Sequence, residues 1–361
     1  MRAFTCDHCG HVVFFENTNC VHCQSTLAFV PERMRMAALA PLPNLPGLWA
    51  PLSPALREQL PFLRMCQNRD GLGVPCNFTT PGDGSQPYCI SCRQTRWLPN
   101  FSNPHNLLRA NKVETAKRYL FYTLSCLQLS SLQGFPAPVF DFLEDLPGGE
   151  PVMTGHLSGI ITLNVAEADD DERARRRVAM HEPYRTLLGH LRHESGHFYW
   201  DTLIRDTHWL EHFRALFGDE RQDYGQALQA YYANGPTCLE SWQQQHVSAY
   251  AASHPWEDWA ETWAHYLHVM DLVETAASYS VQLRLPGHMA SWPPVEDPFA
   301  NPGQSFEHIL HQCVPLTLML NSLNRSLGHN DAYPFALSAG AKAKLKFIHE
   351  VVANHRQSIS A

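Results

Sequence analysis

The chain has 361 residues, of which 44% are hydrophobic and 11% aromatic, so it can bury a sizeable core. Its formal charge is −8, and residues 1–110 carry nine Lys and Arg against six Asp and Glu. That balance lacks the positive excess on which binding to duplex nucleic acid relies. The first residues lack the apolar core of a signal peptide, and no apolar run is long enough for a membrane helix. We therefore expect a globular, cytoplasmic protein with neither a membrane nor a nucleic acid as its partner.

The chain opens with four cysteines arranged as two CxxC pairs, namely Cys6, Cys9, Cys20 and Cys23. Each CxxC pair can turn two thiolates toward one ion, and the segment HVVFFEN between the pairs predicts a short strand. Eleven cysteines are an odd number for a disulfide framework, and clustered pairs in a reducing compartment indicate metal. Residues 1–30 are therefore predicted to be a zinc ribbon that holds a first structural zinc ion.

A second cysteine set follows, with only its last two members in a CxxC pair, and consists of Cys66, Cys76, Cys89 and Cys92. The Gly, Pro and Asp residues between them allow the turns that a four-cysteine site needs. Residues 61–105 are therefore predicted to be a second zinc module, the alternative being a loop with buried thiols. Between the two sets, residues 31–60 contain a proline-rich stretch that predicts a linker or an extended packing strip.

Long helical patterns dominate from about Leu107, which places the main domain at residues 106–361. One exception is the β-prone run from Ile160 to Leu163, which predicts a strand. The backbone edge of such a strand could pair with an extended peptide. The fold class that we expect is α+β, with a mostly helical domain preceded by small four-cysteine zinc modules.

The helical run from Leu187 to Ile204 contains the motif HExxH, formed by His193, Glu194 and His197. Two histidines four residues apart share one helix face and can bind the same zinc ion, while the glutamate between them can act as general base on a zinc-bound water. A chance HExxH is expected in roughly one chain in fifteen of this composition, so the motif by itself is only moderately specific. A third ligand is therefore required.

The segment around Pro255 supplies candidates for the third ligand, because Glu257, Glu261 and His265 follow one another at i+4 spacing on a predicted helix. Glu257 is the first choice, since its separation of 64 residues from His193 fits a second helix that crosses the first. Glu261, one turn later, would then hydrogen-bond a ligand histidine and fix its tautomer. The alternative is an ordinary amphipathic helix with tryptophans on the core and acids in water.

The segments HLRHESGHFYWDTLI and SAYAASHPWEDWAETWAHYL, behind a Cys-rich front end, resemble the bacterial zinc-binding metallopeptidase family that carries an N-terminal zinc ribbon. The resemblance covers almost the whole chain and implies a zincin-like catalytic domain, but no particular substrate. The segment EDWAETW is more distantly similar to the third-ligand helix of gluzincins, from which Asp258 at its second position departs. That similarity also implies a role for Tyr250, seven residues before Glu257, as a stabiliser of the transition state.

The leading hypothesis is therefore a zinc-dependent hydrolase, most simply a peptidase with a peptide or protein substrate. It requires one catalytic zinc held by His193, His197 and Glu257, with Glu194 as general base, Tyr250 near the oxyanion and Glu261 behind a ligand. It also requires the two structural zinc ions. The alternative is a non-catalytic module in which the third metal site is structural or degenerate and the zinc ribbons bind a protein partner.

Overall fold

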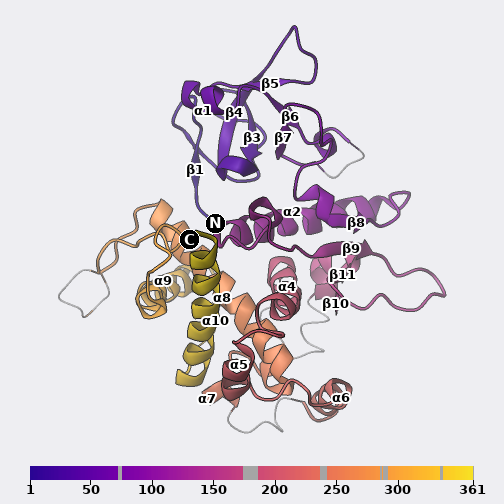
Figure 1. Cartoon of the computed structure of the whole chain (residues 1–361), viewed down its shortest axis with the longest axis vertical. Helices are drawn as coiled ribbons and strands as arrows, with labels where there is room; N and C mark the ends of the chain where they lie inside the picture. The colour runs from indigo at the N-terminus through magenta and orange to yellow at the C-terminus, as the bar shows by residue number, and fades with distance from the viewer. Residues whose placement is uncertain are drawn as a thin grey trace. The chain divides into compact units, whose positions relative to one another are not determined.

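The computed structural model describes residues 1–71, 75–173, 186–235, 242–284, 287, 292–333 and 336–360. The chain forms two compact units. One, here called the Cys-rich unit, contains residues 2–155 and 160–168, and the other, the helical unit, contains Met1, residues 156–159 and residues 169–361. Strands are concentrated in the first unit and long helices in the second, so the predicted α+β class is confirmed (Figure 1).

The Cys-rich unit begins with a two-stranded antiparallel ribbon, in which β1 (Phe4–Thr5) pairs with β2 (Val12–Val13). An antiparallel five-stranded sheet follows, in the order β3 (Thr26–Val30), β4 (Arg35–Pro41), β5 (Trp49–Pro51), β6 (Leu63–Met65) and β7 (Thr79–Pro81). The backbone N–H of Phe29 in β3 also donates to the carbonyl of Asn77, at 2.8 Å. The first and last strands of the sheet therefore meet, which partly closes the sheet upon itself.

The proline-rich stretch predicted as a linker contributes regular structure to this sheet. It contains β4, β5 and the short helix α1 (Pro54–Gln59), and the side chains of Ala37, Leu39 and Leu56 are buried in one apolar cluster. Proline is tolerated here because it lies at a strand end in Pro41 and Pro51 and at the first position of α1. Residues 31–60 therefore form part of the sheet and its core.

A second sheet has the order β10 (Gly155–Leu157), β11 (Ile160–Asn164), β9 (Val139–Leu143) and β8 (Thr95–Trp97), of which β8, β9 and β11 lie in the Cys-rich unit. The predicted strand from Ile160 is confirmed as β11. Because β11 lies between β10 and β9, both of its edges are occupied, and the idea that it offers a free edge to a peptide is wrong. The strand at that end of the sheet is β10.

The long helix α2 (Pro104–Cys126) packs its aromatic residues against the ribbon and the five-stranded sheet. Its first turn is capped by the side chain of Asn103, which accepts from the N–H of His105. Tyr122 contacts Phe29 of β3 and Phe15 of the ribbon, with ring centroids 6.1 and 5.5 Å apart. The aromatic side chains therefore join the ribbon, the sheet and the helix in one core.

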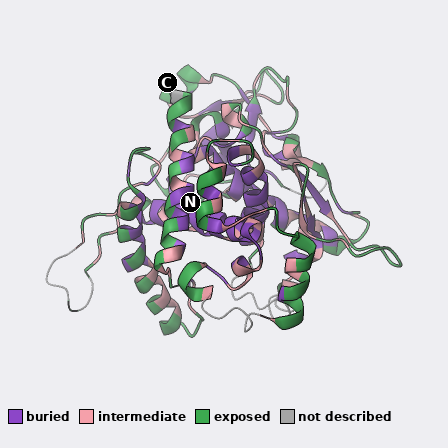
Figure 2. Ribbon diagram, turned by 60° about the horizontal axis from the view of Figure 1, so that its bottom comes forward, coloured by how far each residue is buried: buried purple, intermediate pink, exposed green. Residues whose placement is uncertain are grey.

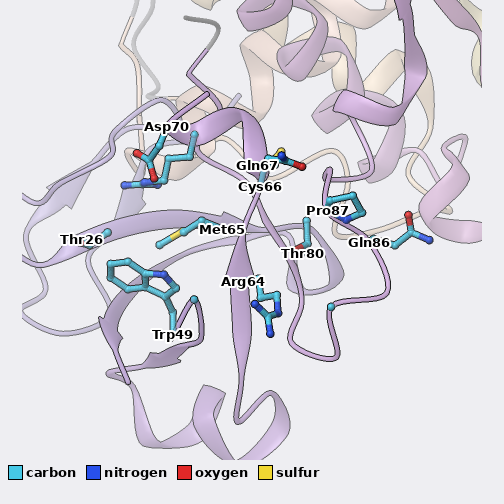
Figure 3. Close-up of a pocket in the computed structure, with 13 residues that line it drawn as sticks. Thr26, Trp49, Arg64, Met65, Cys66, Gln67, Asp70, Thr80, Gln86 and Pro87 are labelled. Carbon is cyan, nitrogen blue, oxygen red and sulfur yellow. The ribbon is translucent and has the colours of Figure 1, made fainter. Parts of the chain in front are cut away.

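A pocket of about 800 Å³ opens beside β6 in the Cys-rich unit (Figure 3). Trp49 and Met65 contribute apolar surface, and Arg64 contributes a guanidinium whose Nε donates to the carbonyl of Gly82 at 3.3 Å. Gly47 has φ +79°, and a Cβ there would lie 3.0 Å from Nη1 of Arg64. Glycine at this position thus serves both the turn and the space that the guanidinium needs.

The helical unit is built around α8 (Pro255–Ser278), against which four other helices pack. These are α4 (Leu187–Leu203), α5 (Leu210–Phe217), α9 (Phe306–Ser326) and α10 (Ala339–Ser360). Among the described residues, the unit also contains the shorter elements α6 (Tyr224–Asn234), α7 (Trp242–Gln245) and η7 (Tyr250–Ser253). Buried and exposed residues alternate along α10, as expected for a helix with one face on the core (Figure 2). Over the described residues, no helix combines the length and the apolar character of a membrane span.

Candidate metal centres

Helix α4 carries His193, Glu194 and His197 into the interior of the helical unit. The hydroxyl of Thr186 caps the helix by accepting from the N–H of Gly189 at 2.9 Å. The three motif residues are 8%, 5% and 3% exposed. Because buried ionisable groups need partners, this degree of burial calls for a charge or a metal nearby.

Two small residues allow α8 to cross α4 closely. A Cβ at Gly196 would lie only 2.8 Å from the Cα of Ala260, so the backbones meet where neither residue has a large side chain. The indole N–H of Trp259 donates to the carbonyl of Gly196 at 2.8 Å, which fixes the crossing. Since Glu257 lies one turn before Ala260, the crossing brings its carboxylate to the histidines of α4.

Three donor atoms meet at this crossing. The distance from Nε2 of His193 to Oε2 of Glu257 is 3.0 Å, and that from Nε2 of His197 to Oε1 of Glu257 is 3.6 Å. One ligand atom from each of the three residues lies within 4.8 Å of the others. Tetrahedral zinc with bonds of about 2.0–2.1 Å holds its ligand atoms about 3.3–3.4 Å apart, so the spacing fits zinc.

Glu261 holds His193 from the side opposite Glu257. Its Oε1 lies 2.7 Å from Nδ1 of His193, and its Oε2 accepts from the hydroxyl of Ser248 at 2.6 Å. When Nδ1 of His193 donates its proton to Glu261, Nε2 presents a lone pair to Oε2 of Glu257. That Oε2 atom receives no well-formed hydrogen bond from a described residue. Two electron-rich atoms in such proximity require a proton or a metal ion beside them, and this supports a metal at the cluster.

The ionisation of the two histidines differs because their surroundings differ. Burial lowers the pKa of His193, but Glu257 and Glu261 raise it, and the net result lies well above the usual value. Burial dominates at His197 and lowers its pKa. Burial likewise raises the pKa of Glu257, yet His197 and His193 bring it down to about 2. The cluster therefore presents an ionised carboxylate and attracts a positive charge.

Glu194 lies next to the cluster without belonging to it. The cluster of donor atoms contains His193, His197 and Glu257 only, and Oε1 of Glu194 lies 3.4 Å from Nε2 of His190. Burial raises the pKa of Glu194, but the interactions with His190 and His193 outweigh this and leave the pKa below its usual value. The carboxylate is therefore ionised and able to accept a proton.

Aromatic side chains surround the cluster. The ring of Tyr250 lies 6.0 Å from that of His193, and the ring of Trp256 lies 3.9 Å from that of His197. On β10, His156 stacks on His197, with ring centroids 6.4 Å apart and an interplanar angle of 17°. The sequence predicts the position of Tyr250 only through resemblance, and nothing in the sequence near His156 or Trp256 indicates a role at this site.

A second tyrosine, absent from the sequence analysis, touches the cluster directly. The hydroxyl of Tyr224, the first residue of α6, donates to Oε1 of Glu257 at 2.6 Å. Its sequence context, DYGQA, identifies a helix start capped by Asp223 and carries no sign of a metal site. Only the tertiary structure reveals this contact.

Two other polar residues of α8 have partners away from the cluster. Asp258 is fully buried, where its Oδ2 accepts from Nζ of Lys344 at 2.5 Å and lies 3.1 Å from Nδ1 of His246. Nδ1 of His265 lies 2.7 Å from the hydroxyl of Tyr333. The departure of Asp258 from the gluzincin pattern thus leaves Glu257 as the acid that faces both histidines.

Both cysteine sets form compact four-thiol clusters, and all eight thiols are free of disulfides. In the first cluster, Sγ of Cys6 lies 3.8 Å from Sγ of Cys23, and in the second Sγ of Cys76 lies 3.7 Å from Sγ of Cys89. Tetrahedral zinc with Zn–S bonds of about 2.3 Å places its sulfur atoms about 3.8 Å apart. Both clusters therefore have the dimensions of a four-thiolate zinc site.

Comparison with known proteins agrees with this arrangement. Residues 106–351 match the family model described as "Putative zinc-binding metallo-peptidase", and residues 3–103 match one described as "zinc-ribbon domain". The chain belongs to this zinc-binding metallopeptidase family. Uncharacterized proteins of Mycobacterium tuberculosis and of Mycobacterium bovis are each 38% identical to the chain over 360 residues, which cover 98% of this chain and 95% of theirs. No solved structure matches the chain.

The metallopeptidase family match contains all the residues of the third cluster, and the zinc-ribbon match contains all eight clustered cysteines. The two family descriptions and the three clusters together support zinc as the metal of this protein. The metallopeptidase match begins at residue 106, inside α2, although α2, β9 and β11 lie in the Cys-rich unit. The family segment and the compact units therefore divide the chain at different places.

Proposed function

We propose that the chain is a zinc-dependent peptidase of the gluzincin type, with a zincin-like helical unit. The observation that carries this proposal is the convergence of His193, His197 and Glu257 at the crossing of α4 and α8. The Nδ1 contact between His193 and Glu261 directs Nε2 toward the same point. Two imidazoles and one carboxylate leave a fourth position open, which is the arrangement of a catalytic zinc site rather than a closed structural one.

The residues around the cluster supply the remaining functions of a hydrolase. Bound zinc provides Lewis acidity, which makes water more acidic and polarises a carbonyl group. Glu194, ionised and adjacent to the cluster, accepts the proton of the attacking water and returns it to the leaving amine. Tyr250, whose ring lies beside His193, is proposed to donate its hydroxyl hydrogen to the developing oxyanion.

The two cysteine clusters are proposed to hold one structural zinc ion each, so that the protein contains three zinc ions in all. Four thiolates complete a tetrahedral shell and leave no open position for a substrate. The substrate is proposed to be a peptide or protein, and the zinc ribbon a surface for a protein partner. The charge of −8 and the absence of a basic excess count against nucleic acid as a partner.

Replacement of Glu194 by Gln tests the catalytic proposal. We expect the E194Q variant to retain three zinc ions and to lose peptide hydrolysis by at least about 100-fold, because general base catalysis typically contributes 10²–10⁴-fold. The assay is incubation with a complex peptide mixture followed by mass spectrometry of newly formed ends. The matched control is E211Q, since the side chain of Glu211 on α5 is 81% exposed.

Two results would contradict this assignment. Loss of one zinc ion in E194Q would mean that Glu194 is a ligand, and equal hydrolysis by wild type and E194Q would remove its role as base. The alternative function, a non-catalytic module, predicts no new peptide ends with the zinc-loaded wild type. It also predicts that one protein partner is recovered equally well by wild type and E194Q.

A further inference from the structure

The contact between α6 and α8 places a hydrogen-bond donor directly on Glu257. Tyr224 donates to Oε1 at 2.6 Å, and its ring contacts His254 and Trp256 edge-on, with centroids 5.2 and 5.6 Å apart. His254 caps α8 by accepting from the N–H of Trp256 at 3.1 Å. The ring of Tyr224 therefore lies against the first turn of α8, which is the turn that carries Glu257.

This contact makes the two carboxylate oxygens of Glu257 unequal. Oε1 receives the hydrogen of Tyr224 and lies 3.6 Å from Nε2 of His197. Oε2 lies 3.0 Å from Nε2 of His193 and receives no well-formed hydrogen bond from a described residue. A carboxylate held at one oxygen cannot rotate freely, so the other oxygen stays directed at the imidazole. The geometry leaves Oε2 as the oxygen available to a cation.

The three cluster residues are held to different degrees. His193 is held at Nδ1 by Glu261, and Glu257 is held at Oε1 by Tyr224. By contrast, Nδ1 of His197 is buried and has no hydrogen-bond partner among the described residues, so on that side the imidazole is held by ring packing. Groups that orient metal ligands from behind typically contribute 10–100-fold to metal affinity.

We infer that Tyr224 is a positioning residue that holds the carboxylate of Glu257 with Oε2 directed at His193 and thereby sets the zinc affinity of this site. The inference rests on the proposed function, because it takes Glu257 as the third zinc ligand. In the sequence, α6 lies between the HExxH motif and Glu257. The inference gives α6 a role in holding the first turn of α8, which carries Glu257. Tyr224 acts through Glu257, and no contact with a substrate is required of it.

The test compares the full-length Y224F and Y232F variants with wild type. Y224F removes only the hydroxyl, and Tyr224 is 37% exposed, so the change leaves the core untouched. Tyr232 lies on the same helix and is 50% exposed, and Y232F likewise removes one hydroxyl, which makes it the matched control. The affinity of the most weakly held zinc ion is measured by competition with a chromogenic chelator. We expect it to fall 10–100-fold in Y224F and to stay within twofold of wild type in Y232F.

A second readout is independent of affinity and of activity. With Co²⁺ at saturating concentration in the third site and zinc kept in the cysteine clusters, the visible absorption reports the arrangement of ligands, and we expect Y224F to alter that spectrum. Retention of two tightly held zinc ions and an unchanged circular dichroism spectrum verify that the variant is folded.

If Y224F matched Y232F in both zinc affinity and Co²⁺ spectrum, the inference would be wrong. If E257A still held three zinc ions, the proposed ligand set itself would be wrong, whatever Tyr224 does.

Discussion

The two glutamates one turn apart on α8 have different environments, and their roles can be separated by that difference. Glu257 faces both imidazoles through Nε2 of each, whereas Glu261 contacts His193 only at Nδ1 and also accepts from Ser248. A ligand and a group that orients a ligand should respond differently to removal, because only the first supplies a bond to the metal.

Substitution of each glutamate therefore distinguishes the two roles. After dialysis against a mild chelator, we expect wild type to contain three zinc ions and E257A to contain two. We expect E261Q to contain three, with the third bound 10–100-fold more weakly than in wild type. Elemental analysis of zinc per chain measures this directly. A drop to two zinc ions in E261Q with three retained in E257A would exchange the two roles. Two zinc ions in all three proteins would mean that the α4–α8 crossing holds no tight metal.

At the scale of elements, the position of the third cluster depends on how closely α4 and α8 approach. Gly196 lies inside the HExxH motif, and it meets Ala260 where a Cβ would be 2.8 Å from the Cα of that residue and 3.2 Å from the Cβ of Trp263. The motif therefore contains both the two ligands and the small residue that brings the third ligand to them. Glycine in a helix interior lowers helix propensity, so its use here reflects packing.

The substitution G196A tests this view of the crossing. The added methyl must push α8 away, and overpacking of this kind costs about 1–3 kcal/mol, which exceeds the gain of about 1 kcal/mol in helix propensity. We expect a lower melting temperature and weaker binding of the third zinc ion. The control is G225A on α6, where a Cβ would meet only Oδ1 of Asp223 at 3.5 Å, so that the variant should be neutral or slightly more stable. Unchanged stability and zinc affinity in G196A would refute the close-crossing argument.

At the scale of the whole molecule, features encoded by local spacing were accessible from the sequence, and features created by tertiary contacts were not. The eight clustered cysteines follow from short ligand spacings, and the i+4 pattern from Glu257 to Glu261 identifies one helix face. The contact of Tyr224 with Glu257 and the pairing of Asp258 with Lys344 join residues 33 and 86 positions apart. No local pattern indicates which distant segments meet.

The same limit explains the proline-rich stretch. Composition predicts a linker or an extended packing strip for residues 31–60, but it does not show that β4 finds partners on both sides in β3 and β5. Pairing with neighbouring strands is a property of the complete sheet. Proline content alone therefore cannot distinguish a linker from strands whose ends carry proline.

The helical unit as a whole should lose stability in mild acid, because several of its histidines are buried in the neutral form. Burial lowers the pKa of His265 to about 4, and burial also lowers the pKa of His268 and His349. Between pH 6.5 and about 4 the unfolded chain binds a proton at position 265 that the folded chain does not, so the free energy of unfolding falls as the pH falls through this window. The loss from His265 alone should be about 3 kcal/mol once the pH is below its folded-state pKa.

The H265Q variant measures this contribution. Its amide can still interact with the hydroxyl of Tyr333 but cannot titrate, so urea unfolding at a series of pH values should give a shallower dependence on pH than wild type gives. Acid also displaces zinc, and because that loss is common to both proteins, the difference between their slopes isolates His265. The control is a variant of His329, an exposed histidine, which should reproduce the wild-type slope. Identical slopes for H265Q and wild type would mean that the pKa of His265 is the same in the folded and the unfolded chain, and that burial does not lower it.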